Sequence, residues 1–270
     1  MKKLEHDEAK LINTIKTIKD LESTTGKSIS ILKYDTYRNT DTTYSRQQIK
    51  IIYDMNWNEF KINNEFLMPK VNNDFNNLLA ETNEAYYWAG FIFADGSISK
   101  DYKSFNMRLS DKDFEHTLKF RKFINYTGIQ QSNDISVSSP HIKTFCDKFD
   151  IVNNKSHVCI PYEKYKNMPY DLWLSWFIGY TDGDGSIVKR KDRENLVNVR
   201  YVAHVSNLPF HQQLLADIKL RIDDCNSSIY FENESVIRWR LAKKSIVKTL
   251  KEHSYKVPSL DRKWSRVNFA

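Results

Sequence analysis

Two stretches of the chain carry apolar and small residues at helical spacing, and both end in Asp-Gly-Ser-Ile. One is Trp88-Ala-Gly-Phe-Ile-Phe-Ala-Asp-Gly-Ser-Ile98, and the other is Phe177-Ile-Gly-Tyr-Thr-Asp-Gly-Asp-Gly-Ser-Ile187. The pattern predicts two helices that end at Asp95 and Asp184, each directly before a glycine that stops the helix. Similar residues occupy the same offsets in the two stretches, so the chain contains an internal repeat.

Small residues recur along both predicted helices at three- to five-residue intervals. A glycine inside a helix costs about 0.8–1 kcal/mol relative to alanine, so these glycines need a reason. Close packing of the two helices against each other supplies one, and it would bring Asp95 and Asp184 together. The residues predicted at this helix interface are Gly90, Ala94, Ser175, Gly179 and Gly183.

The two terminal aspartates are unfavourable in isolation. An acid in the last turn faces the negative end of the helix dipole, and two crowded acids repel each other. A divalent cation between the carboxylates removes this cost, because Mg²⁺ takes oxygen ligands from one or two carboxylates, phosphate and water. A calcium loop starting at Asp182 is excluded, since its sixth position is Ile187 and its twelfth is Arg193.

The remaining periodicity predicts an α+β fold made of a duplicated αββαββα unit. In the first half we expect strands in 97–110, a helix near 112–126, a short strand pair around 135–137 and a helix near 141–149. In the second half we expect strands in 186–206, a helix at 209–223, a hairpin at 228–241 and a helix at 244–253. Residues 1–70 form a small helical module with helices near 7–21, 44–53 and 57–60, and the Asn-rich residues 71–80 form a linker. The two halves are then 81–165 and 166–270.

The charge pattern favours a nucleic-acid partner. The chain has 270 residues and a formal net charge of +7, and basic side chains follow each of the two predicted helices that end at Asp95 and Asp184. A two-stranded ribbon fits the major groove, where basic and amide side chains can contact base edges. For each basic residue alone, a solvated surface charge is the simpler interpretation. The candidate DNA-binding residues in these strands are Lys100, Lys103, Arg108, Lys189, Arg190, Lys191, Arg193, Arg200, His204, Arg238 and Arg240.

Both repeated segments resemble the signature helix of the LAGLIDADG homing endonucleases in their two-copy, single-chain form. The second copy is the closer match, whereas the first carries Phe93 where the family usually has its first acid. The resemblance runs from about Glu81 to the C-terminus. It implies a saddle of two pseudo-symmetric halves and a monomeric, Mg²⁺-dependent enzyme. Such an enzyme hydrolyses both strands of DNA across the minor groove of a long asymmetric site.

The resemblance also implies roles for individual residues. Asp95 and Asp184 would bind metal, with the carbonyls of Ala94 and Gly183 as neighbours. A lysine late in each half corresponds best to Lys155 and Lys263, with Arg262 as a competing assignment and a further DNA contact. The polar position that ends the second strand of each half corresponds most simply to Asp111 and Asn207. The N-terminal module resembles helix-turn-helix-like modules of homing nucleases, and an ordinary helical extension fits it equally well.

Other classes of protein find little support in the sequence. The three cysteines, Cys146, Cys159 and Cys225, lack Cys-x-x-Cys spacing. No apolar run reaches the length of a membrane span, and no Walker-type glycine loop indicates a nucleotide cofactor. We therefore expect an intracellular DNA-binding monomer. Two alternatives stay open: a non-cleaving maturase or transcription regulator on the same fold, and a carboxylate-pair hydrolase of glycans.

Overall fold

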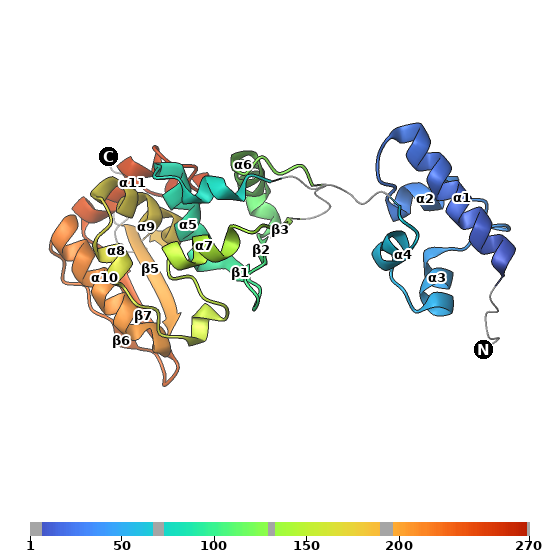
Figure 1. Cartoon of the computed structure of the whole chain (residues 1–270). Coiled ribbons are helices and arrows are strands. Elements are labelled where there is room, and N and C mark those ends of the chain that lie inside the picture. The colour runs from blue at the N-terminus through green and yellow to red at the C-terminus, as the bar shows by residue number, and fades with distance from the viewer. Residues whose placement is uncertain (1–6, 67–72, 129–132, 190–196, 269–270) are drawn as a thin grey trace. The chain divides into compact units, whose positions relative to one another are not determined.

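The computed structural model describes residues 7–66, 73–128, 133–189 and 197–268. The chain divides into two compact units, Met1–Val71 and Asn72–Ala270, and Figure 1 shows their elements. None of the described helices combines the length and the apolar character needed to cross a membrane.

The smaller unit consists of helices packed around an aromatic core. The helices are α1 (Glu8–Thr25), α2 (Ile31–Tyr37), α3 (Arg46–Tyr53) and α4 (Trp57–Asn63). The predicted helices of this unit are present, and α2 is a further helix that was not predicted. Ser45 and Gln48 form a capping box that fixes the start of α3. The core contains Tyr34, Ile49, Trp57 and Phe60.

The larger unit is α+β and repeats its elements in two halves. The first half contains η1 (Phe75–Leu79), α5 (Asn83–Asp95), β1 (Gly96–Ile98), β2 (Ser104–Arg108), η2 (Asp111–Asp113), α6 (Phe114–Phe123), β3 (Asp134–Ser138), α7 (Ile142–Lys148), η3 (Lys155–His157) and α8 (Glu163–Lys166). The second contains α9 (Tyr170–Asp184), β4 (Ser186–Lys189), β5 (Val197–His204), η4 (Val205–Asn207), α10 (Leu208–Arg221), β6 (Tyr230–Phe231), β7 (Val236–Leu241), α11 (Lys244–Ser254) and α12 (Asp261–Trp264). The predicted α+β class is confirmed.

Each half has its own antiparallel sheet. The strand order is β1-β2-β3 in the first half and β4-β5-β7-β6 in the second. The second half therefore has the predicted αββαββα order. The prediction of a strand pair around 135–137 in the first half is wrong. Among the described residues this region contributes one strand, β3, which pairs with β2.

The segment expected to be a linker, 71–80, is also corrected in part. Phe75 and Leu78 lie on η1 and are 1% and 0% exposed in the core of the larger unit. These two apolar side chains, three residues apart, anchor η1 to the core, so this part of the segment is not a tether.

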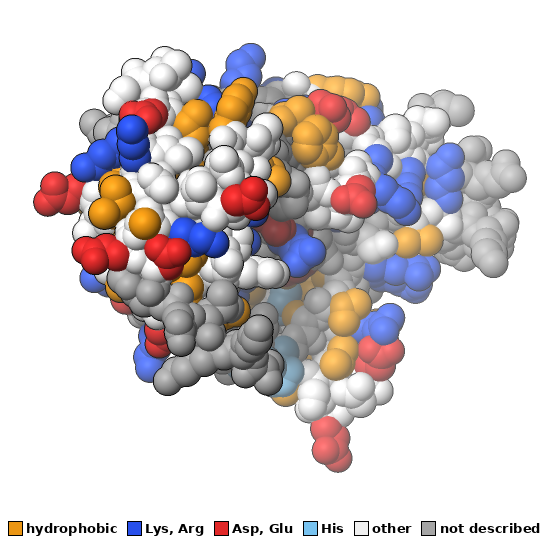
Figure 2. Space-filling view, turned by 90° about the vertical axis from the view of Figure 1, so that its right-hand side faces the viewer, with side chains coloured by type: hydrophobic (Ala, Val, Ile, Leu, Met, Phe, Trp, Pro, Cys, Tyr) orange, Lys and Arg blue, Asp and Glu red, His pale blue; other side chains and the backbone are white. Residues whose placement is uncertain are grey.

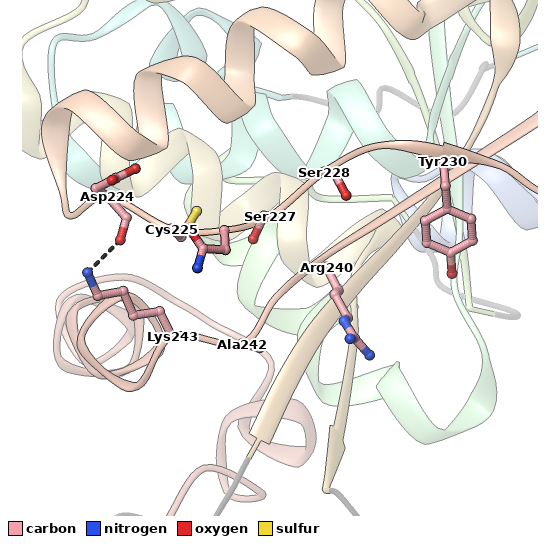
Figure 3. A pocket seen from close by; sticks show the side chains of 9 residues that line it. Asp224, Cys225, Ser227, Ser228, Tyr230, Arg240, Ala242 and Lys243 are labelled. Carbon is pink, nitrogen blue, oxygen red and sulfur yellow. Dashed lines mark hydrogen bonds between the residues drawn. The ribbon is translucent and has the colours of Figure 1, made fainter.

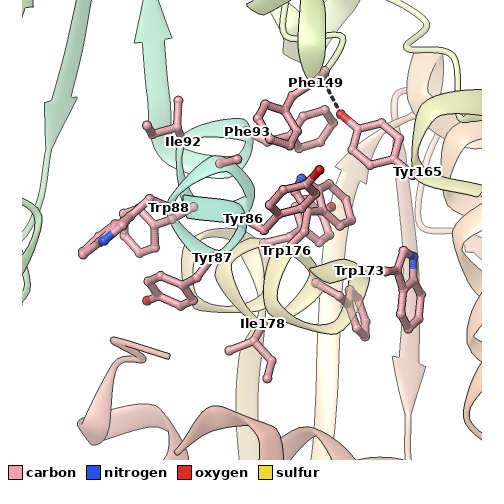
Figure 4. Close-up of a cluster of buried hydrophobic side chains, with 14 of the residues drawn as sticks. Tyr86, Tyr87, Trp88, Ile92, Phe93, Phe149, Tyr165, Trp173, Trp176 and Ile178 are labelled. Atoms are coloured by element: carbon pink, nitrogen blue, oxygen red, sulfur yellow. Dashed lines mark hydrogen bonds between the residues drawn. The ribbon is translucent and has the colours of Figure 1, made fainter. Parts of the chain in front are cut away.

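Helices α5 and α9 pack side by side at the centre of the larger unit, with a sheet on either side (Figures 1 and 4). Two glycines make this possible. A Cβ on Gly90 would lie 1.9 Å from the Trp176 carbonyl oxygen, and a Cβ on Gly179 would lie 1.9 Å from the Tyr87 carbonyl oxygen. Backbone meets backbone at Gly90 and Gly179, two of the residues predicted at the helix interface.

Aromatic side chains surround the crossing of the two helices. Trp88 and Trp176 are fully buried, and Figure 4 shows them on opposite sides of the pair. Phe93 stacks on Phe210 with ring centroids 5.2 Å apart. Ser175, predicted at the helix interface, instead directs its hydroxyl to His253 of α11, 2.8 Å away. The packed core thus fixes both signature helices along their length.

Candidate active site and nucleic-acid interface

Both signature helices end at the predicted aspartates. Thr82 caps the start of α5 through the backbone N–H of Ala85, and Pro169 precedes α9. The glycines that follow, Gly96 and Gly185, have φ of −74° and −82° and lead directly into strands. They are not left-handed helix stops. They are glycines because a Cβ would lie 2.6 Å from the Ile92 carbonyl oxygen or 2.5 Å from that of Thr181.

Asp95 and Asp184 come together where the two helices end. Desolvation raises the pKa of Asp95, and the charges of Lys263 and Lys155 oppose this shift. Desolvation, followed by the charge of Asp95, raises the pKa of Asp184 to about 6. The two carboxylates thus repel each other in solvent-accessible positions, which is the arrangement expected of a cation site.

The two predicted lysines occupy equivalent places beside these acids. The Lys155 amine donates to the carbonyl oxygens of Ile92, 3.2 Å away, and Gly96. The Lys263 amine donates to those of Thr181, 3.3 Å away, and Gly185, 2.7 Å away. Each lysine therefore neutralises the last carbonyls of one signature helix, as a cation at a helix C-terminus should.

Each lysine also interacts electrostatically with the aspartate of the other helix. The charge of Asp184 is the main influence opposing the desolvation that lowers the pKa of Lys155 to about 8. The charge of Lys263 is the main influence opposing the raised pKa of Asp95. These interactions define two centres. One contains Asp184 and Lys155, the other contains Asp95 and Lys263, and each is built from both halves of the chain.

Of the two predicted polar residues, Asn207 lies at a centre and Asp111 does not. The Asn207 amide donates to the Lys155 carbonyl oxygen, 3.2 Å away. Its buried Oδ1 has no hydrogen-bond partner among the described residues. Asp111 is exposed and accepts a hydrogen bond from Asn133.

The structural counterpart of Asn207 is Asp113, which the sequence analysis missed. Asn207 directly precedes α10, and Asp113 directly precedes α6. Counting from the helix starts instead of the strand ends would have found it. Asp113 is 7% exposed and bonds Arg262, with Nη2 to Oδ2 at 2.6 Å. This bidentate ion pair holds the pKa of Asp113 below its usual value despite desolvation. Arg262 is therefore an ion-pair partner beside the Asp95 centre, whereas Lys263 donates to the carbonyl oxygens at the end of α9.

A cavity of about 190 Å³ opens at the Asp184 centre. Its lining brings together five predicted site residues: Ala94, Lys155, Asp184, His204 and Asn207. Ala94 is one of the two residues whose backbone carbonyls were predicted to neighbour a metal. The Gly183 carbonyl, the other predicted neighbour, accepts a hydrogen bond from the Lys263 amine at 3.3 Å.

The residues at the helix ends fit a hard divalent cation. Two oxygen donors from separate helices meet, two lysines limit the excess negative charge, and polar space is present on one side. Asp95 and Asp184 would hold the ion, and phosphate and water would complete its coordination.

The open face of the second sheet carries the predicted basic residues. Arg238 and Arg240 lie on the same side of β7, opposite the buried Trp239. Arg200 pairs directly with Arg240 across β5 and β7, and both side chains are exposed. Like charges directly opposite each other in a sheet are destabilising, so this face suits an anionic partner. Arg238 is already paired with Glu232, with Nη2 to Oε1 at 2.6 Å.

A groove of about 700 Å³ adjoins this face, and Arg240 and Tyr230 line it (Figure 3). On the face that Figure 2 shows, Lys and Arg side chains are scattered among Asp and Glu. The paired arginines of the second sheet are therefore a clearer indication of where a polyanion would lie.

The other candidate basic residues are less uniformly placed. Lys100 and Lys189 are exposed. Lys103 and Arg108 are exposed beside Asp101, 3.9 Å away, and Asp134, 3.3 Å away. The candidates Arg190, Lys191 and Arg193 lie outside the described residues.

No protein-family model and no curated protein matches the chain. Among solved structures, it is similar to the I-SmaMI LAGLIDADG homing endonuclease bound to cleaved DNA (TM-score 0.43, 13% identity, 67% of this chain and 85% of that chain). It is also similar to the LAGLIDADG meganuclease I-CpaMI bound to uncleaved DNA (TM-score 0.41, 15% identity, 66% and 85%). A third similar structure is I-SmaMI bound to its uncleaved DNA target in the presence of calcium ions (TM-score 0.39, 14% identity, 68% and 85%).

Proposed function

We propose that the chain is a site-specific double-strand DNA endonuclease of the LAGLIDADG type. One observation carries the proposal: two acids end two backbone-packed helices, and each lies beside a lysine held by the final carbonyls of a helix. This arrangement breaks local rules in both halves, because it places acids at negative helix ends and glycines in helix interiors. Local penalties that recur in both copies indicate function.

The geometry assigns a task to each side chain. Asp95 and Asp184 would hold the divalent cation, Mg²⁺ in the proposal, which supplies positive charge and acidifies a bound water when present. Lys155 and Lys263 place positive charge where the phosphate gains negative charge during hydrolysis. The unpartnered Oδ1 of Asn207 can orient a water at the Asp184 centre. Two such centres would cut one strand each across the minor groove.

The two sheets would lie along the DNA on either side of these centres. Because their sequences differ, the site would be asymmetric and about 20 base pairs long, roughly two helical turns. A single chain supplies both centres, so the protein would act as a monomer. A DNA substrate implies that it acts inside a cell or an organelle.

The N-terminal unit would add a further DNA contact through α3. Arg46, Gln47 and Lys50 of this helix are exposed and line a groove with Arg38, which directly follows α2. The capped start of α3 presents these side chains much as the second helix of a helix-turn-helix presents its first residues.

A non-cleaving DNA-binding protein on the same fold is the alternative. Such a protein gains nothing from two crowded acids whose pKa values are raised. The alternative therefore leaves the paired centres unexplained.

The test begins with selection of cleaved sites from a randomised DNA library in Mg²⁺. On a selected site, Asp95→Asn and Asp184→Asn should each abolish double-strand cleavage and leave the Kd for DNA within a few-fold of wild type. Asp111→Asn is the matched control, because Asp111 is an exposed acid whose carboxylate accepts a hydrogen bond from Asn133, and it should cut normally. Full cleavage by either site variant at saturating Mg²⁺ would overturn the proposal.

A further inference from the structure

Asp182 is a buried carboxylate whose charge the proposed reaction does not use. It lies two residues before Asp184 on α9 and is 2% exposed. The equivalent position on α5 is Phe93, which packs among aromatic rings. The second half alone therefore places a charged group at this point of the interior.

Three hydrogen bonds converge on the Asp182 carboxylate. Oδ1 accepts from the Trp264 indole N–H at 2.8 Å. Oδ2 accepts from the Leu260 backbone N–H at 2.8 Å and from the Tyr87 hydroxyl at 2.9 Å. Leu260 and Trp264 lie on either side of Lys263, so two of the three bonds fix the short segment that carries the active-site lysine.

The first half of the chain holds the same segment. Tyr87 belongs to α5, and its hydroxyl also lies 2.9 Å from Nε2 of His116 on α6. Lys119 of α6 donates to the Ser259 carbonyl oxygen at 3.3 Å. The segment thus lies between α9 and the first half, with the Asp182 carboxylate at the point where these contacts meet.

The segment that carries Lys155 is held by different groups. Asn153 donates to the Ile98 carbonyl oxygen at 2.6 Å, and Asn207 donates to the carbonyl oxygens of Lys155 and Ser156, 3.2 and 3.4 Å away. Neutral amides fix this lysine, whereas a buried charge fixes the other.

We propose that Asp182 is a positioning residue for Lys263, so that the two strand cuts depend on different supports within one protein. The inference rests on the proposed nuclease function, and it deepens that function by assigning Asp182 to one of the two centres. Asparagine at 182 offers one carbonyl oxygen where the carboxylate offers two oxygens, and its NH₂ faces a donor. At least one bond to the segment is then lost, because two donors cannot pair.

The first test needs no DNA. Trace acetylation of lysines with acetic anhydride, measured by mass spectrometry, reports how well each amine is held and covered. Lys263 is 7% exposed in wild type, and its labelling should rise at least 5-fold in Asp182→Asn while that of Lys155 stays within 2-fold. Asp217→Asn is the matched control, because Asp217 is also a buried acid that accepts a tyrosine hydroxyl, from Tyr162 at 3.0 Å. It should leave Lys263 protected.

The second test follows each DNA strand separately on a selected site with strand-specific labels. The strand whose cleavage depends on Lys263 is identified with Lys263→Ala. In Asp182→Asn, cleavage of that strand should slow at least 10-fold relative to the other, and nicked DNA should accumulate. Tyr87→Phe should shift the ratio in the same direction by a smaller factor.

The two tests separate the possible failures. If the protein cuts no DNA, the proposed function fails and the labelling still decides the role of Asp182. Unchanged Lys263 labelling, equal labelling changes at both lysines, or equal slowing of both strands would each overturn the positioning role.

Discussion

Gly183 and Ala94 occupy equivalent positions on the two signature helices, and a Cβ atom on Gly183 would lie 2.2 Å from the Cβ of Ala94. The helix ends thus have room for one methyl group, and the alanine–glycine pair supplies one. The same hypothetical atom would lie 3.5 Å from Cγ of Asp95. The contact that sets the spacing of the helix ends therefore also sets the spacing of the acids.

We predict that Gly183→Ala destabilises the protein and that adding Ala94→Gly restores most of the loss. The single change forces two methyl groups into the space of one, which costs about 1–3 kcal/mol. The double variant only moves the methyl from one helix to the other. Urea unfolding of all four members of the cycle gives the coupling energy. Additive effects of the two changes would contradict this account of the helix interface.

The sequence predicted the parts of the site that depend on a repeated local pattern. Asp95 and Asp184 could be placed because both copies share the same ending, and the helix interface followed from Gly90 and Gly179. Lys155 and Lys263 came from the resemblance, since nothing in their own surroundings distinguishes them from other lysines. The structure places both at helix ends.

The parts that the sequence did not predict depend on contacts between distant segments. Asp111 and Asp113 are both acidic and two residues apart, and only the packing of Arg262, 149 residues away, distinguishes them. Asp182 looked like part of a motif, but its partners Tyr87, Leu260 and Trp264 lie on three other segments. The strand β3 was predicted as one of a pair, but its partner is β2, a strand distant in the sequence that the residues of β3 do not identify.

Because their pKa values are raised, Asp95 and Asp184 should make the metal-free protein less stable at neutral pH than at acidic pH. The pKa of Asp184 is raised to about 6 in the folded protein, against about 3.9 in the unfolded chain. The folded state therefore binds more protons between these values, and this contribution to stability is present below pH 4 and lost as the pH rises through 6.

We accordingly predict that Asp184→Asn stabilises the metal-free protein at pH 8. The gain should be on the order of 1 kcal/mol, less than the full pKa shift implies, because the carboxylate is exposed and solvent screens it. The difference from wild type should vanish near pH 4, and Mg²⁺ should stabilise wild type more than the variant. Thermal unfolding at both pH values, with and without Mg²⁺, tests this. A variant less stable than wild type at pH 8 would show that the Asp184 carboxylate does not destabilise the folded protein.

The N-terminal unit should strengthen DNA binding without affecting the chemistry. We predict that the double change Arg46→Ala and Lys50→Ala weakens binding and lowers the salt dependence of log Kd by about two units, if both side chains contact phosphate. The matched control is Lys16→Ala with Lys19→Ala, two exposed lysines of α1. Single-turnover cleavage at saturating protein should be unchanged in both. Equal loss of affinity in the two pairs would mean that α3 is not the contact.

The last prediction concerns Arg240 and the arginine opposite it. Because Arg200 and Arg240 face each other on an exposed sheet surface, Arg240→Ala should remove a repulsion and stabilise the free protein by a few tenths of a kcal/mol. If Arg240 contacts a base edge in the major groove, the same change should weaken binding by about 1–3 kcal/mol and relax preference at one or two base pairs. Arg238→Ala should have a smaller effect on binding, since Glu232 already engages its guanidinium.

Lys189→Ala provides the contrast, because this exposed lysine near the end of β4 is expected to contact phosphate. This substitution should weaken binding to all DNA sequences alike and lower the salt dependence of log Kd by about one unit. Binding titrations against single-substitution variants of a selected site, at two salt concentrations, distinguish the two kinds of contact. An unchanged sequence preference in Arg240→Ala would place the DNA on a different surface. A loss of both stability and binding would show instead that the arginine pair is a structural part of the sheet.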